Sequence, residues 1–139
     1  MTMELSPSYA NEYLLAAEET QREAEVLANS GLLKGALNRA YYAMFYAASA
    51  ALVAQHVKLP KSHRALITLF FRHLVEPKKM QRDFHRNLVR AFQLRQQGDY
   101  EVHVQVGEDE VRETLDKAVA FIAEVNVRER RPSSKARAR

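Results

Sequence analysis

Residues 32–56 read LLKGALNRAYYAMFYAASAALVAQH, and this stretch decides the fold. It contains eight alanines, and its leucine, tyrosine and phenylalanine residues leave no continuous polar face on a helix. A helix that is apolar on nearly all sides is expected to be buried. Its least polar part, residues 40–54, is shorter than the roughly 20 residues that cross a bilayer. We therefore predict that this segment is the central helix of a soluble bundle.

The segments on either side of this helix are also predicted to be helical, from apolar periodicity and from their start and stop signals. The first helix begins at Ser6-Pro7 and ends before Gly31, which suits the left-handed backbone of a helix C-cap. Ser62 is expected to cap the next helix, which ends at Glu76-Pro77. Two more helices are predicted over residues 78–97 and 107–127, with a bend at residues 97–100 between the first and the second. The predicted fold class is all-α, a bundle of four to five helices.

The chain carries a formal net charge of +4 that is unevenly distributed. Residues 128–139 hold six Lys or Arg and one Glu, whereas residues 1–127 sum to −1. We interpret residues 1–127 as the folded domain and residues 128–139 as a basic disordered tail. Within the domain, residues 58–95 sum to +8 between two acidic segments. This pattern favours packing of acidic against basic helices, and the alternative is a basic surface for a polyanion.

Several classes of site are excluded or disfavoured by the composition. The chain has no cysteine, so it contains no disulfide, no zinc-thiolate site and no thiol nucleophile. Its five histidines show no metal-ligand spacing, and we expect neither a metal nor a cofactor. Residues 1–11 lack the basic region and apolar run of a signal peptide, and a cytoplasmic location without membrane attachment is the expectation.

The first candidate site lies on the central helix. Asn38 and Arg39 stand within an almost entirely apolar segment, close to Tyr41 and Tyr42. Polar groups in such a segment are costly unless each finds a partner. One interpretation is a core polar network that satisfies the tyrosine hydroxyl groups, and the other is a polar pocket between helices. The residues alone leave both open.

The second candidate site extends from Arg95 to His103 and includes Asp99 and Tyr100. An arginine can hold a phosphate with two parallel hydrogen bonds, and a histidine can transfer protons near neutral pH. Metal-free attack of a ribose hydroxyl on its own phosphate needs both groups. From physical chemistry alone we favour the simpler interpretation, in which an Arg95–Asp99 pair locks the helix end and His103 is exposed.

A third candidate is a basic stripe. Arg82, Arg86 and Arg90 recur every four residues and therefore share one helix face. Together with the tail, they are the residues that a bundle binding nucleic acid without catalysis would use.

Taken together, NRAYYAMF at residues 38–45, KSH at residues 61–63 and RQQGDY at residues 95–100 resemble the HEPN superfamily. The name stands for higher eukaryote and prokaryote nucleotide-binding domain. The nearest likeness is to its small stand-alone branch of uncharacterised prokaryotic proteins, and it spans residues 8–125. The resemblance implies an up-and-down helical bundle, often a homodimer. It also implies pairing with a minimal nucleotidyltransferase, in many relatives as toxin and antitoxin.

Catalytically active relatives are metal-independent ribonucleases with an Arg, four to six intervening residues and a His, and their site forms across the dimer. The resemblance makes Arg95 the catalytic arginine and Asn38 the supporting polar residue. The next histidine is His103, with seven residues between, and Asp99 and Tyr100 stand in that interval. The candidate catalytic residues are therefore Arg95, Asp99 and His103. The following are candidates for binding nucleotide or RNA: Asn38, Arg39, Tyr42, Tyr100, Arg82, Arg86 and Arg90.

Three hypotheses follow for the function. The first and preferred one is an interaction module that dimerises and partners a nucleotidyltransferase or its nucleotide. The second is a ribonuclease toxin in which Arg95 holds the scissile phosphate. The third is a nucleic-acid-binding bundle without chemistry.

Overall fold

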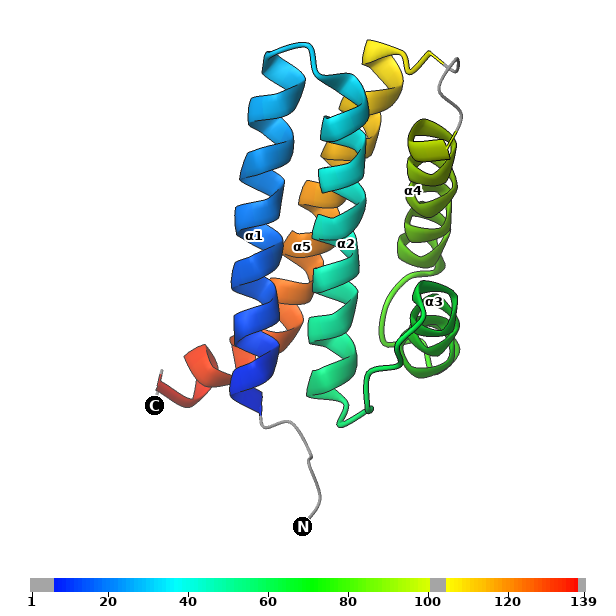
Figure 1. Ribbon diagram of the computed structural model, residues 1–139. Helices are drawn as coiled ribbons and strands as arrows, with labels where there is room; N and C mark the ends of the chain where they lie inside the picture. Colours follow the sequence, from blue (N-terminus) through cyan, green and yellow to red (C-terminus); the bar gives the residue numbers. More distant parts are fainter. Residues whose placement is uncertain (1–6, 101–104, 138–139) are drawn as a thin grey trace.

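The computed structural model describes residues 7–100 and 105–137, with side chains described for residues 9–99 and 105–129. Within these residues the chain forms α1 (Pro7–Asn29), α2 (Leu33–Ala54), α3 (His63–Phe70), α4 (Arg82–Tyr100) and α5 (Glu108–Arg137). A five-residue π-helical segment, Phe71–Val75, continues α3. Figure 1 shows α1, α2, α4 and α5 running alternately up and down, with α3 below α4. The predicted all-α, up-and-down bundle is therefore confirmed.

Helix α2 is the centre of the bundle, as its sequence predicts. It packs against every other helix of the described chain, whereas α1 packs only on α2 and α5. Its eight alanines are buried apart from Ala54, and Tyr41, Met44 and Leu52 are fully buried. None of the described helices combines the length and apolarity that a membrane-spanning segment requires.

Two helix ends agree with their predicted capping signals. At the end of α1, Gly31 has a φ of 78°, its N–H donates to the carbonyl of Ala28, and the N–H of Leu32 donates to the carbonyl of Leu27. These are the two hydrogen bonds of a Schellman motif. At the start of α3, Ser62 Oγ accepts a 3.0 Å hydrogen bond from the N–H of Ala65. This cap places His63 at the first position of α3.

The start predicted for α4 at residue 78 is wrong. Lys78 has a φ of 62°, and the N–H groups of Lys79 and Met80 both donate to the carbonyl of Leu74. The chain therefore folds back on the preceding turn, buries Met80, and begins α4 only at Arg82.

The bend predicted at residues 97–100 is also wrong, because α4 continues through Gly98 to Tyr100. Gly98 is buried where α4 passes α2, and a Cβ there would lie 3.8 Å from Lys34 Cγ and 3.9 Å from Leu37 Cδ2. Tertiary packing against α2 thus supports the helix across a glycine. The consequence is that Asp99 stands one helical turn after Arg95.

Helix α5 extends to Arg137, ten residues beyond the end predicted at Val127. Arg128, which we assigned to the disordered tail, donates a 2.6 Å hydrogen bond from Nη1 to the carbonyl of Lys79. Arg128 and Glu129 therefore belong to the packed domain. The side chains of residues 130–139 lie outside the described part.

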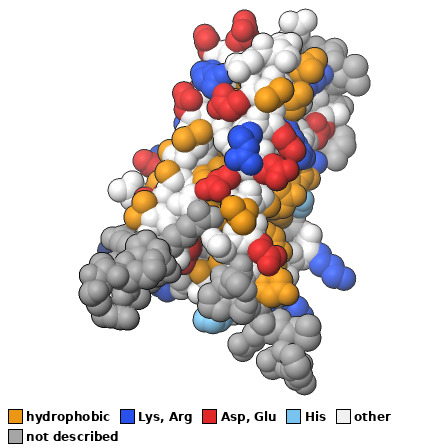
Figure 2. All heavy atoms as spheres, turned by 90° about the vertical axis from the view of Figure 1, so that its left-hand side faces the viewer, with side chains coloured by type: hydrophobic (Ala, Val, Ile, Leu, Met, Phe, Trp, Pro, Cys, Tyr) orange, Lys and Arg blue, Asp and Glu red, His pale blue; other side chains and the backbone are white. Residues whose placement is uncertain are grey.

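One ion pair between helices, Arg90 with Glu110, joins the basic segment of residues 58–95 to an acidic segment, as the favoured interpretation of the charge pattern expects. Figure 2, which looks onto the α1 side, shows acidic and basic side chains intermixed with apolar ones. Ion pairs between helices join Arg39 to Glu23 (3.4 Å), Arg90 to Glu110 (3.5 Å) and Arg112 to Glu25 (2.9 Å).

Candidate functional site

Arg95 is the centre of a cluster of polar and aromatic side chains from α2 and α4. Its side chain is only 17% exposed, and its Nε lies 2.9 Å from Oδ2 of Asp99. That contact is an ion pair without the alignment of a hydrogen bond. Nη2 of Arg95 also donates a long, 3.4 Å hydrogen bond to the hydroxyl of Tyr42. The predicted Arg95–Asp99 pair is thus confirmed, and one face of the guanidinium is held against α2.

Asp99 connects this arginine to the other candidate residues on α2. Its Oδ2 accepts a 3.4 Å hydrogen bond from Nδ2 of Asn38. Oδ1 of Asn38 in turn accepts from Nε and Nη2 of Arg39, at 3.2 and 3.0 Å. Since Arg39 also pairs with Glu23, a continuous polar chain runs from α4 across α2 to α1. The structure therefore brings Asn38, Arg39, Asp99 and Arg95 together.

Two adjacent tyrosines form the aromatic wall of the cluster. The guanidinium carbon of Arg95 lies 5.4 Å from the ring centroid of Tyr42 and 5.8 Å from that of Tyr41. The guanidinium carbon of Arg39 lies 5.1 Å from the Tyr42 ring centroid. These distances are within the range of cation–π attraction. Both tyrosine hydroxyl groups have partners in the protein, as the core-network interpretation requires.

His63 joins the cluster through Tyr41, although we did not predict it as a site residue. Its Nδ1 lies 2.8 Å from the hydroxyl of Tyr41, in a hydrogen bond whose direction depends on the imidazole tautomer. Its ring stacks on Phe45 with the centroids 4.4 Å apart. The only signal in the sequence was the KSH segment, which contributes to the family resemblance but carries no role by itself.

Burial and charge set the protonation of these two groups. Burial, and then the positive charge of Arg95, lower the pKa of His63. Burial, and then the neighbouring Tyr42, raise the pKa of Tyr41, which Arg95 opposes. The cluster therefore holds a neutral imidazole and a protonated phenol beside a permanent cation.

The remaining candidates do not join this cluster in the described part of the chain. Arg86 pairs with Asp83 at 2.8 Å, and Arg90 pairs with Glu110. The guanidinium carbon of Arg82 lies 5.7 Å from the ring centroid of Phe71. Two arginines of the predicted basic stripe thus have acidic partners, which weakens it as a polyanion surface. Tyr100 ends α4, but its side chain and all of His103 lie outside the described residues.

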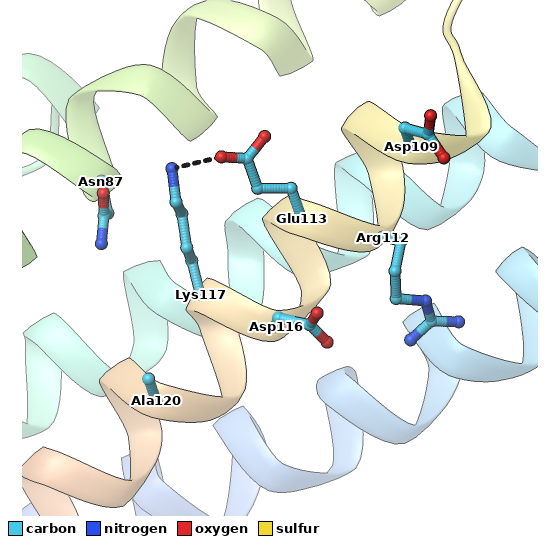
Figure 3. Close-up of a pocket in the computed structure, with 7 residues that line it drawn as sticks. All are labelled: Asn87, Asp109, Arg112, Glu113, Asp116, Lys117 and Ala120. Atoms are coloured by element: carbon cyan, nitrogen blue, oxygen red, sulfur yellow. Dashed lines mark ion pairs between the residues drawn. The ribbon is translucent and has the colours of Figure 1, made fainter.

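A surface pocket between α4 and α5 contains none of the cluster residues. Figure 3 shows Asn87 of α4 beside Lys117 of α5, whereas Arg112 of α5 points away from Asn87. Lys117 pairs with Glu113 at 3.1 Å, and Arg112 pairs with Glu25. The pocket lining therefore contains one internal ion pair, and its three acidic and two basic side chains leave it with a small net negative charge. No group of three or more potential metal ligands occurs among the side chains described.

Comparison with known proteins gives one family and a consistent set of relatives. The HEPN domain family model matches residues 10–129. A UPF0332 protein of Gloeobacter violaceus is 40% identical over 84 residues, which cover 60% of this chain and 66% of that protein. A UPF0332 protein of Thermotoga maritima is 33% identical over 106 residues, 76% of this chain and 80% of the relative. "Putative toxin MJ0142" of Methanocaldococcus jannaschii is 28% identical, over 76% of this chain and 71% of that protein.

Proposed function

This chain belongs to the HEPN domain family, and we propose that it is the toxin-like member of a two-protein system. In this proposal it forms a homodimer and pairs with a minimal nucleotidyltransferase. Two relatives that carry the name "Putative toxin" support the toxin-like role. The Arg95 cluster is the surface through which the chain engages a phosphate of a nucleotide or of RNA.

The observation that carries this proposal is the way in which Arg95 is held. A guanidinium that is largely buried and fixed on one side by Asp99 and Tyr42 loses little freedom when it binds a phosphate. Its neighbours Asn38 and Arg39 add a hydrogen-bond donor and a second cation along one polar chain. A cluster built only for stability would gain little from two partly buried arginines.

Dimerisation is supported by apolar side chains on the outside of the bundle. Leu15 and Val26 on α1 are 54% and 64% exposed, and their spacing of eleven residues places them on one helix face. Light scattering at micromolar concentration tests this part, and a monomeric mass would refute it.

The partner is tested by co-expression with the neighbouring reading frame. We expect that frame to encode a nucleotidyltransferase that co-purifies with this chain. Arg95→Ala is expected to weaken the association of this chain with the nucleotidyltransferase in the presence of nucleotide. Arg90→Ala is the matched control, because Arg90 lies on the same helix outside the cluster. A chain that forms no complex with that protein contradicts the partner proposal.

A specific observation favours a second candidate function, that of a metal-independent endoribonuclease. A neutral imidazole lies beside the same tyrosines that contact Arg95. The test is cleavage of a single-stranded oligoribonucleotide with excess chelator. Wild type is expected to cut and Arg95→Ala to be inactive, and equal cutting by both would indicate contamination.

A further inference from the structure

The ribonuclease candidate requires a group that removes the proton of a ribose hydroxyl. The residue one helical turn after Arg95 is Asp99, which is already engaged by Arg95 and by Asn38. Both contacts involve the same carboxylate oxygen, Oδ2, which is thereby occupied by Arg95 and Asn38. We therefore expect the proton acceptor to be another group near the guanidinium of Arg95.

His63 at the start of α3 and Arg95 on α4 lie near the same two tyrosines of α2, Tyr41 and Tyr42. The ring centroids of His63 and Tyr41 are 5.7 Å apart, and those of His63 and Tyr42 are 5.5 Å apart. The guanidinium carbon of Arg95 lies 5.8 and 5.4 Å from the same two ring centroids. The positive charge of Arg95 also contributes to lowering the pKa of the His63 imidazole.

The surroundings of His63 hold its ring in one orientation. Ser62 caps α3 and places His63 at its first position. The ring is nearly parallel to those of Tyr41 and Phe45, with interplanar angles of 23° and 24°. Nδ1 is bound by the Tyr41 hydroxyl, while the described residues provide no hydrogen bond to Nε2. An imidazole oriented through one nitrogen with the other available is the arrangement of a general base.

We propose that His63 is the proton-transfer residue of the Arg95 site and acts on an RNA phosphodiester. This inference rests on the ribonuclease candidate described above. In the active tautomer, Nδ1–H donates to the Tyr41 oxygen and Nε2 carries the free lone pair. The charge distribution keeps the imidazole neutral until substrate arrives, and a phosphate bound at Arg95 then favours its protonation.

The reaction step balances without a metal ion. Nε2 of His63 takes the proton of the ribose 2′-hydroxyl, and the 2′-oxygen forms a bond to phosphorus. The bond from phosphorus to the 5′-oxygen breaks, and that oxygen takes a proton from a water molecule. The hydroxide that this leaves takes the proton held on Nε2 of His63, which returns the imidazole to its neutral form. Arg95 holds the non-bridging oxygens, whose negative charge increases in the transition state. The products are a 2′,3′-cyclic phosphate and a 5′-hydroxyl end.

The test compares three histidine variants in chelator. His63→Asn keeps a donor near the Tyr41 hydroxyl but removes Nε2. His85→Asn is the matched control, because His85 also contacts an aromatic ring, that of Phe71, and also has a lowered pKa. His103→Asn tests the histidine that the family pattern suggests. Cleavage of a fluorescent single-stranded oligoribonucleotide is the readout, and binding of its 2′-deoxy form is measured in parallel.

We expect His63→Asn to lose on the order of 100-fold or more in cleavage rate while binding the deoxy form within about three-fold of wild type. His85→Asn is expected to cut like wild type. If His63→Asn cuts normally while Arg95→Ala is inactive, the ribonuclease stands and His63 is not its base. If wild type does not cut, the ribonuclease candidate and the role of His63 fall together.

A measurement on the wild-type chain covers the case in which His63→Asn does not fold. Binding of the deoxy oligonucleotide is followed through the imidazole signals in NMR spectra. We expect the His63 signals to shift and the His85 signals to stay in place. Unchanged His63 signals at saturation would overturn the proposal.

Discussion

Arg95 and Asp99 form an ion pair within one turn of α4, with Nε of the arginine 2.9 Å from Oδ2 of the carboxylate. The two side chains are 17% and 28% exposed, so water screens the pair only in part. Asp99 thus acts as an internal counterion that neutralises the guanidinium in the free protein. A phosphate that binds Arg95 has to compete with this carboxylate.

Replacing Asp99 by Asn is expected to strengthen anion binding. The competing charge disappears, and affinity for a single-stranded deoxyoligonucleotide should rise by about five-fold, because a partly exposed ion pair is worth up to about 1 kcal/mol. Fluorescence anisotropy measures the change. Asp83→Asn is the control, since Asp83 pairs with Arg86 on the same helix but away from the cluster. Weaker binding by Asp99→Asn would mean that the carboxylate itself supports the ligand.

Replacing Arg95 by Met is expected to raise the pKa of His63. Burial is the larger cause of its lowered pKa and stays in place, so the pKa should return only part of the way to its usual value. An NMR titration of the imidazole measures this shift, and Arg90→Met should leave it unchanged. An unaltered pKa in Arg95→Met would show that the two groups are not electrostatically coupled.

The folded state is expected to lose stability as the pH falls below about 6.5, the usual pKa of an exposed histidine. In the folded protein, burial lowers the pKa of both His63 and His85. The positive charge of Arg95 lowers it further at His63, and that of Arg82 does so at His85. As the pH falls, the two histidines therefore become protonated in the unfolded chain before they do so in the folded protein. The stability that is present above the pKa of the unfolded chain is lost as the pH falls toward the lower pKa values of the folded protein.

Melting followed by circular dichroism at about pH 7.5 and about pH 5 checks this expectation. The double variant His63→Gln, His85→Gln should show a smaller decrease in Tm between the two pH values than wild type does. An equal decrease in both proteins would place the acid sensitivity elsewhere, for example on carboxylates.

Replacing Ser62 by Ala is expected to cost about 1 kcal/mol in the free energy of unfolding. The variant leaves the N–H of Ala65 without the side-chain acceptor that it has in the native protein. Urea unfolding measures the loss. Ser62→Asp retains an acceptor and should stay close to wild type, and a loss of similar size there would point away from capping.

Replacing Phe121 by Ala is expected to cost about 3–5 kcal/mol, because it opens a cavity in the core. Phe121 is fully buried, with ring centroids 5.3 Å from Phe70 and 5.7 Å from Phe84. Val119→Ala on the same helix is the control, since Val119 is 48% exposed and should change stability by no more than about 0.5 kcal/mol. Similar losses in the two variants would contradict this account of the core.

The sequence by itself determined the helices and the central place of α2. Apolar periodicity, the caps at Gly31 and Ser62 and the alanine-rich stretch are local properties, and local backbone preferences act on neighbours within a few residues. The same locality explains the errors at the ends of α4. Gly98 predicts a bend by its own preference, and only packing against α2 keeps the helix intact there.

Only the tertiary structure decided which polar groups meet. Asn38, His63 and Arg95 stand on three different helices, and no periodicity relates positions so far apart in the chain. Their meeting depends on how the helices pack around the small side chains of α2, which is a property of the whole core. The sequence could thus identify Arg95 and Asn38 through family resemblance, whereas the contact of His63 with Tyr41 follows from the fold alone.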